Sequence, residues 1–336
     1  MPTPKRIFTL LLLPCAGLMM LAGCGGPAAH SPTEIYVLIA SNLKLPYWQT
    51  AAAGFKKAAG ELQVKYEVIG PETYDPKVQH EDFQRLLNRQ AKPTGILISA
   101  AAPDLVKADI DAAIAQGIPV IAIDADAPSS KRLFFIGTDN YRAGVMAAEV
   151  AVKRMQGKGN VAVFTMPEQA NLNQRLRGYQ DTFASHPQIK IVHTMDIKGD
   201  PATAFDAAKE LLLSAKVKPD AFVCLEAIAC AEVADVLNRN QVTDKTVVAM
   251  DTEPDTLEWV KKGVISATVA QKPFTMAYVG LKMLDDLHHH KPQNLDANWA
   301  QDLSSPIPAF VDTGATLVDQ TSVEKFLQLG PASPAK

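Results

Sequence analysis

Residues 34–48 read EIYVLIASNLKLPYW, and their pattern indicates the class of fold. It opens with a short β-branched and apolar run that predicts a strand over residues 34–40. An amphipathic stretch over residues 48–62 predicts a helix, and the turn between the two contains no glycine. Because parallel sheets with helical crossovers are built from such strand–helix units, the sequence predicts an α/β protein.

The same alternation continues along the chain and then restarts. The first series predicts strands over residues 34–40, 64–69, 95–99, 119–123 and 133–136, with helices that include 48–62 and 77–90. The second series predicts strands over residues 160–164, 189–193, 221–225, 246–250 and 266–270, separated by helices near 172–185, 202–214 and 228–238. Two open parallel sheets in tandem predict two Rossmann-like lobes that face each other across a cleft.

The N-terminal segment predicts export. Lys5 and Arg6 precede an apolar run over residues 7–21, which is too short to favour a transmembrane helix and closes on small residues before Cys24. We therefore expect a signal peptide over residues 1–23. The sequence LAGC at residues 21–24 resembles the bacterial lipobox, which implies that Cys24 is acylated and holds the protein on a membrane. Residues 24–33 are expected to form a tether to the fold.

Charge and cysteine content exclude some classes of protein. The 336-residue chain carries a net charge of −3, whereas a nucleic-acid binder would show a strongly basic face. Cys15 leaves with the signal and Cys24 takes lipid, so Cys224 and Cys230 remain in the body of the protein. A disulfide between them is left open, but two reduced and buried cysteines are favoured.

Physics places a ligand site beyond the carboxyl ends of the strands. No glycine-rich phosphate cradle occurs at a strand end, so we expect no nucleotide cofactor. The turn after the first strand instead contains Tyr47 and Trp48, whose rings can pack against the C–H faces of a sugar. The alternative is that these rings pack in the core of the lobe.

Polar groups follow several of the other predicted strands, and they suit sugar hydroxyls. These groups are Asp124 with Asp126, Arg175, Glu226, Asp251 and Gln271. Asp251 has a second interpretation as the N-cap of the next helix. In the cleft, three carboxylates would face a single cation; the carboxylates are Asp124, Glu226 and Asp251, and the cation is Arg175. This excess of negative charge should disfavour anionic ligands.

The three histidines at residues 288–290 are not expected to form a metal site. Three consecutive residues do not converge on one ion, so a solvated helix end is favoured over a metal site. Asp285 and Asp286 are expected to face solvent, and Asp200 is expected to cap a helix.

The order and spacing of these residues resemble the type I periplasmic binding protein family and its ribose- and galactose-binding members. The motifs that carry the resemblance are PYW at 46–48, IAID at 121–124, IGTDN at 136–140 with Gly144, RLRGY at 175–179, VVAMD at 247–251 and ATVAQ at 267–271. The resemblance implies that Tyr47 and Trp48 sandwich a sugar ring while Asp124, Arg175, Asp251 and Gln271 hold its hydroxyls. It also implies an N-terminal lobe of residues 34–138 plus 272–304, a C-terminal lobe of residues 139–271 plus 305–330, and a three-segment hinge.

Four positions depart from the ribose-type pattern. Leu45 stands where a polar Asn is expected, Ala125 where an Arg follows the aspartate, Glu226 where an Asn is expected, and Met250 where an aromatic is expected. We interpret these departures as pointing away from ribose, toward another sugar, a polyol, an amino sugar or a small signalling carbohydrate.

The function implied by the resemblance is that of a monomeric, lipid-anchored substrate-binding protein on the periplasmic or other extracytoplasmic face. It would hand its ligand to an ABC permease in the inner membrane, and it would not be an enzyme. Two other classes stay open. The protein could serve a membrane sensor in place of a transporter, or it could be a glycoside hydrolase that uses Asp124 and Asp251 as a carboxylate pair.

Overall fold

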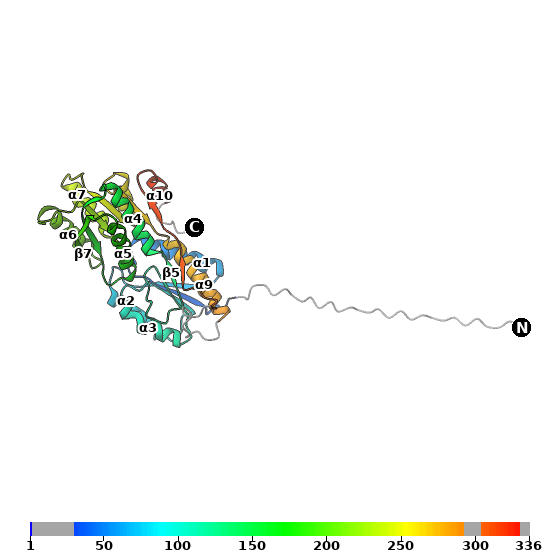
Figure 1. Ribbon diagram of the computed structural model, residues 1–336. Helices are drawn as coiled ribbons and strands as arrows, with labels where there is room; N and C mark the ends of the chain where they lie inside the picture. Colours follow the sequence, from blue (N-terminus) through cyan, green and yellow to red (C-terminus); the bar gives the residue numbers. More distant parts are fainter. Residues whose placement is uncertain (2–29, 292–303, 330–336) are drawn as a thin grey trace.

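A computed structural model describes residue 1 and residues 30–291 and 304–329 of the chain. Two lobes of similar build lie side by side, each with a six-stranded sheet covered by helices (Figure 1). The predicted α/β class, with two open sheets joined by a three-segment hinge, is confirmed. Residues 2–29, which include Cys24 and most of the expected signal and tether, lie outside the described residues. Within the described ranges, no helix is long and apolar enough to span a membrane.

The first lobe holds a sheet in the order β11-β5-β4-β3-β1-β2, with every pairing parallel. Its strands are β1 Ile35–Ile39, β2 Lys65–Ile69, β3 Gly95–Ile98, β4 Val120–Ile123, β5 Phe135–Gly137 and β11 Phe310–Asp312. Its helices are α1 Pro46–Leu62, α2 Pro76–Leu87, α3 Pro103–Ala115 and α9 Pro273–His289. Each of the four helices has proline in its first turn, where the fixed φ suits the helix and no N–H is lost from the hydrogen-bond ladder.

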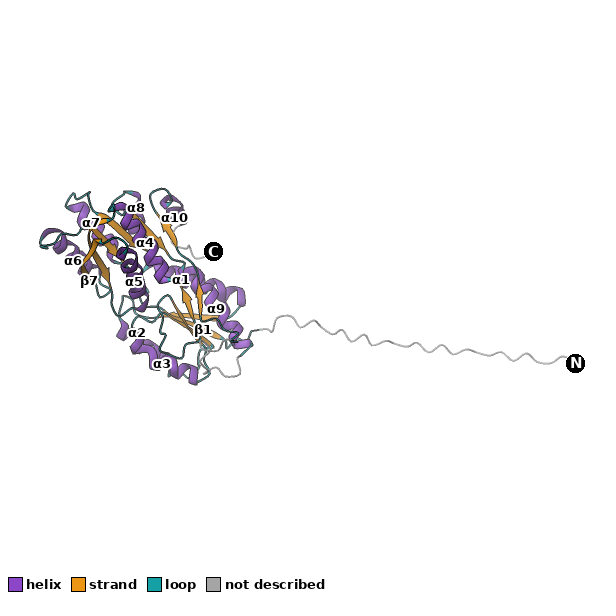
Figure 2. Ribbon diagram, viewed as in Figure 1, coloured by secondary structure: helices purple, strands orange, loops and turns teal. Residues whose placement is uncertain are grey.

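The second lobe likewise has helices packed around one sheet (Figure 2). Its strand order is β12-β10-β9-β8-β6-β7, and β12 alone pairs antiparallel. Its strands are β6 Lys158–Thr165, β7 Gln188–Asp196, β8 Ala221–Cys224, β9 Thr246–Met250, β10 Ala267–Ala270 and β12 Thr316–Val318. Its helices are α4 Asn140–Arg154, α5 Ala170–Ala184, α6 Pro201–Leu213, α7 Ala229–Arg239, α8 Pro254–Lys261 and α10 Val323–Leu329. As expected, Asp200 caps α6, because its side chain accepts hydrogen bonds from the backbone N–H groups of Ala202 and Thr203.

Each lobe has its own hydrophobic core, so each can hold its shape while the two move relative to each other. Tyr36, Phe55 and Phe83 are fully buried in the first lobe, and Phe164 and Phe222 are fully buried in the second. The central strands of the two sheets are buried on both faces, whereas the edge strands β2 and β7 are partly exposed.

The chain passes between the sheets three times, and the third passage differs from the expectation. The first passage follows β5 and the second follows β10. The predicted third boundary after Ser304 is wrong, because β11 still pairs with β5 of the first lobe and the chain joins the second sheet only at β12. Residues 310–312 therefore belong to the first sheet.

The interpretation of Cys224 and Cys230 as reduced thiols is also wrong. The two residues form a disulfide that joins the end of β8 to the first turn of α7, six positions later. The bond closes the loop between this strand and helix, a tight geometry that sequence spacing alone does not reveal.

Asp285 was expected to face solvent and instead is buried. It is 9% exposed and accepts a hydrogen bond of 2.9 Å from the Tyr36 hydroxyl. Asp286, the next residue of α9, is exposed as expected.

Candidate functional site

A cleft lies where the carboxyl ends of both sheets meet, as expected for open α/β sheets. Its cavity volume is about 60 Å³, which is smaller than that of most small-molecule sites. The predicted site residues that line it are Leu45, Tyr47, Trp48, Asp124, Arg175, Glu226, Asp251 and Gln271. Met250 does not line it and is buried in the core of the second lobe.

The two aromatic residues form one wall of the cleft. They lie in the first turn of α1, and their rings meet edge to face with centroids 5.4 Å apart and planes 72° apart. The predicted sandwich of a sugar between Tyr47 and Trp48 is wrong, because rings in mutual contact leave no space between them. A ligand can instead pack against this wall from one side, opposite Met166 and Leu172 of the second lobe.

Asp124 follows β4 directly and faces the cleft. The Tyr47 hydroxyl donates to its Oδ1 at 2.7 Å, and the Ser99 hydroxyl donates to its Oδ2 at 3.2 Å. Burial raises the pKa of this carboxyl, and these hydrogen bonds oppose the shift. Asp126 is held away from this pocket in a bidentate pair with Arg132, at 2.5 Å and 2.7 Å.

Asp251 occupies the matching position in the second lobe, directly after β9. Both aspartates have positive φ angles, 62° at Asp124 and 70° at Asp251, which non-glycine residues rarely adopt and which cluster at functional sites. Each backbone N–H is fixed by a carbonyl of the neighbouring strand, Ile136 for Asp124 and Val269 for Asp251. The two lobes therefore present one carboxylate each from equivalent strand ends.

Asp251 does not cap the next helix. The residue before α8 is Glu253, and no side-chain cap bond occurs there. The Asp251 carboxylate instead accepts from the Gln271 amide at 2.9 Å, and burial raises its pKa to about 6. Gln271 Oε1 is buried without a hydrogen-bond partner among the described residues.

Arg175 is the cation of the cleft, and α5 places it there. Its Nε donates to Asn140 Oδ1 at 2.8 Å, and its Nη1 donates to the Leu225 carbonyl at 2.6 Å. Helices α4 and α5 approach closely at Gly144, where an added Cβ would lie 2.2 Å from the Arg175 carbonyl oxygen. This approach brings Asn140 within reach of the guanidinium. The third nitrogen, Nη2, is buried without a hydrogen-bond partner in the described part of the chain.

Glu226 lines the cleft but also has a structural task. Its two carboxylate oxygens accept from the backbone N–H groups of Ile228 at 2.6 Å and Ala229 at 2.9 Å, at the start of α7. Burial raises its pKa to about 7, and these two hydrogen bonds oppose the shift. Near neutral pH the cleft is therefore less negative than a count of its carboxylates suggests.

Glu253 connects the lobes and was not predicted from sequence. The Tyr47 backbone N–H, at the start of α1, donates to Glu253 Oε1 at 3.1 Å. Burial raises the pKa of Glu253 to about 8, and the nearby Asp251 adds to the shift. The helix start at Pro254 reveals no such role, because the contact exists only when the lobes are together.

Several other lining residues were also missed. These are Ser41, Asn42, Tyr74, Met166, Gln169, Asn171, Leu172, Ala227 and Ile228. Ser41 and Asn42 directly follow a predicted strand, which is a signal that could have found them. Asn171 stands out because its Oδ1 is buried without a hydrogen-bond partner among the described residues.

Comparison with known proteins agrees with this geometry. Residues 35–292 match the family model described as "Periplasmic binding protein domain". The D-allose-binding periplasmic protein of Escherichia coli K12 is 24% identical over 261 residues, which cover 75% of this chain and 83% of that protein. The ribose import binding protein RbsB of Haemophilus influenzae is 23% identical, and the match covers 80% of this chain and 90% of RbsB.

Solved structures agree as well. The arabinose-binding protein AraP from Geobacillus stearothermophilus is 34% identical, with a TM-score of 0.71. The match covers 87% of this chain and 99% of AraP. A solute-binding protein from Burkholderia graminis, solved in complex with D-arabinose, is 28% identical with a TM-score of 0.76. The match covers 86% of this chain and 96% of the Burkholderia chain. The chain belongs to the periplasmic binding protein domain family, whose members are substrate-binding proteins and not enzymes.

Proposed function

We propose that this protein is the substrate-binding lipoprotein of an ABC importer and that it captures a small neutral sugar or polyol between its lobes. The relatives named for allose, ribose and arabinose support this assignment of ligand class. The lipobox-like residues before Cys24 support export and anchoring through that cysteine.

The observation that carries the proposal is a set of unsatisfied polar atoms in the cleft. Arg175 Nη2, Gln271 Oε1 and Asn171 Oδ1 line one pocket, and each is buried without a hydrogen-bond partner among the described residues. Burying such atoms unpaired costs about 1 to 3 kcal/mol each. A polyhydroxyl ligand offers both donors and acceptors, so it can satisfy the guanidinium and the two amide oxygens together.

Charge selects the ligand class. Arg175 faces the carboxyl groups of Asp124, Asp251 and Glu226, whose pKa values burial raises. A sugar acid or sugar phosphate would add a negative charge to a site that already disfavours it. A neutral sugar adds none, and an ammonium group would pair with one of the carboxylates.

Closure is the proposed means of capture. The hydrogen bond from Tyr47 to Glu253 joins α1 of the first lobe to the residue before α8 of the second, so it exists only in the closed arrangement. A ligand that contacts both lobes favours this arrangement over an open one.

The same closed surface would also serve a membrane sensor. One similar structure, 26% identical with a TM-score of 0.75, is the XylFII–LytSN complex. Co-purification of the ligand-loaded chain with a permease supports uptake, and co-purification with a sensor protein supports this second role.

A thermal-shift screen tests the ligand class. We expect the unfolding temperature to rise with one or more neutral pentoses, hexoses or polyols, because a ligand that binds the native state stabilises it. Uronic acids, sugar phosphates and amino acids serve as the comparison set and should have no effect. Stabilisation by a sugar acid, with none by neutral sugars, would contradict the proposal.

A further inference from the structure

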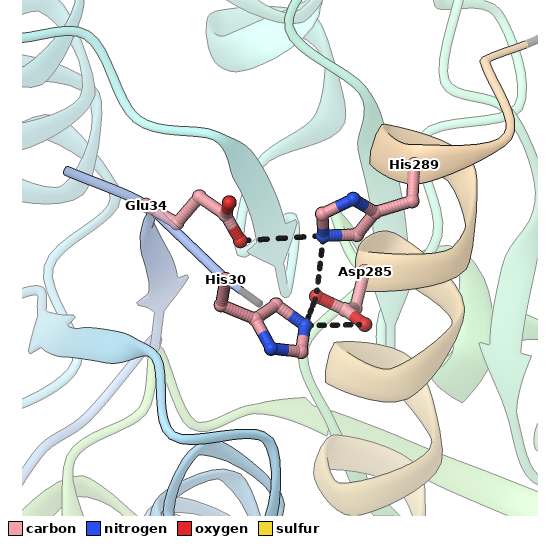
Figure 3. A group of neighbouring side chains, drawn as sticks. All are labelled: His30, Glu34, Asp285 and His289. Atoms are coloured by element: carbon pink, nitrogen blue, oxygen red, sulfur yellow. Dashed lines mark hydrogen bonds and ion pairs between the residues drawn. The ribbon is translucent and has the colours of Figure 1, made fainter. Parts of the chain in front are cut away.

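A cluster of four potential metal ligands lies at the start of the first lobe, away from the sugar cleft. His30 and Glu34 lie in the segment that leads into β1, and Asp285 and His289 lie on the last turns of α9. Figure 3 shows the two imidazoles and two carboxylates facing one another. Each residue offers one ligand atom, and these atoms lie within 4.8 Å of one another.

The geometry points to a binding site for a divalent transition metal, and we propose that His30, Glu34, Asp285 and His289 bind zinc. Two imidazole nitrogens and two carboxylate oxygens form a ligand set that zinc accepts in a tetrahedral site. Zinc–ligand distances near 2.0 to 2.2 Å place tetrahedral ligands about 3.4 Å apart.

The distances in the cluster match that spacing. His30 Nε2 lies 3.1 Å from Asp285 Oδ1, and His289 Nε2 lies 3.3 Å from Glu34 Oε2 and 3.7 Å from Asp285 Oδ1. Both histidines turn the same nitrogen, Nε2, toward the carboxylates (Figure 3). Only small movements of these side chains would bring all four onto one ion.

Glu34 provides a second, independent sign of a ligand. Its side chain is 7% exposed, and one oxygen, Oε1, accepts from the Ser31 N–H at 2.6 Å. The other oxygen, Oε2, is buried and receives no hydrogen bond within the described residues, although it faces His289. A carboxylate oxygen in this position is free to bind a cation.

The surroundings support the cluster as a built site. The Tyr36 hydroxyl donates to Asp285 Oδ1 at 2.9 Å, which fixes the carboxylate as outer partners do in metal sites. Asp285 and His289 are four residues apart on α9, so they share one face of the helix. This site was not predicted from sequence, because residues 288–290 were interpreted together and only His289 turns toward the cluster.

A bound ion would tie the segment before β1 to the end of α9, two parts of the chain that are 255 positions apart. The cluster is thus a closed structural site, with four protein ligands and no open position for a substrate. We expect the ion to stabilise the first lobe and leave sugar binding unchanged.

The test is a zinc titration of the full chain in detergent, against a competing chelator dye. We expect one zinc per chain, a higher unfolding temperature with zinc, and at least tenfold weaker binding in His30→Ala and in His289→Ala. His30→Ala precedes the first strand, so its folding should be intact. The double variant His288→Ala/His290→Ala is the matched control and should bind zinc as the parent does.

Cobalt provides a second readout, because a tetrahedral site gives Co²⁺ intense visible absorption. The proposal is overturned if the chain binds no zinc, if His30→Ala binds as the parent does, or if the control variant loses binding. Each variant should keep the parent's response in the sugar screen, and this separates failure of the metal site from failure of the proposed function.

Discussion

Arg175 is the residue on which the cleft depends most directly. Two of its nitrogens are used to hold it in place, on Asn140 and on the Leu225 carbonyl, and the third is left for a ligand. The N–H donors of the flat guanidinium point in fixed directions, so two nitrogens can hold the group in place while the third donates to a ligand.

Replacing Arg175 by Lys keeps the positive charge but removes the three separate nitrogen donors of the guanidinium. One ammonium cannot bond to Asn140, to Leu225 and to a ligand in the same geometry. We expect sugar affinity to fall at least tenfold, since hydrogen bonds to charged groups contribute about 1.5 to 3 kcal/mol each. Calorimetry with the sugar found in the screen measures this, and unchanged affinity would remove Arg175 from the binding site.

Glu226 makes the stability of the ligand-free protein depend on pH. Burial raises its pKa from 4.5 to about 7 in the folded state. The folded protein then holds a proton that the unfolded chain has lost, so stability falls as pH rises from about 4.5 to about 7. At about 1.4 kcal/mol per pKa unit, the fall is of the order of 3 kcal/mol.

Glu226→Gln removes this contribution, so its stability should fall less between pH 5 and pH 8 than that of the parent. Urea denaturation at the two pH values measures the difference, and Glu210→Gln on the exposed face of α6 is the control. The substitution has its own cost, because Gln offers one acceptor to the two N–H groups that Glu226 serves. An equal pH response in parent and variant would contradict the assignment.

Sequence predicted the strand-end residues well and the lobe-spanning contacts poorly. Asp124 and Asp251 could be found because they directly follow apolar runs, and the structure places both in the cleft. Their positive φ angles could not be found, since aspartate does not require that conformation. Glu253 was missed because it meets Tyr47 only when two separately folded lobes come together.

At the scale of elements, the loop from β8 to α7 is fixed at both sides. The disulfide joins Cys224 to Cys230, and Glu226 between them binds the first N–H groups of the helix. The cleft wall around Glu226 therefore depends on a loop that is covalently closed.

Replacing both cysteines by serine opens this loop. We expect a loss of about 2 kcal/mol in the free energy of unfolding, the size predicted for closing so short a loop. Sugar affinity should fall as well, because the position of Glu226 becomes less fixed. Urea denaturation and calorimetry of the double variant measure the two effects. Parent-like values in both would mean that the bond does not shape the cleft.

The apolar strands of the two predicted series were visible in the sequence, whereas the two strands near the C-terminus were not. Buried runs such as residues 34–40 and 246–250 carry a clear apolar pattern, and they form β1 and β9. Strands β11 and β12 have three residues each, which is too few for a periodic signal. The resemblance to the family placed the third passage between lobes too early, at Ser304, and no predicted strand nearby corrected it.

At the scale of the whole molecule, the protein consists of two lobes joined by a three-segment hinge. Separate cores keep each lobe intact, while Tyr47 and Glu253 meet across the cleft. The proposed role of the ligand is to favour this closed form by contacting both Asp124 and Asp251.

The distance between the lobes, with and without sugar, tests this account most directly. Probes can be placed at exposed positions on opposite lobes, Asp104 of α3 and Lys209 of α6, and read by fluorescence energy transfer in the full chain. The account predicts that the sugar found in the screen shortens this distance, and that a uronic acid leaves it unchanged. An unchanged distance at a sugar concentration that calorimetry shows to be saturating would contradict capture by closure.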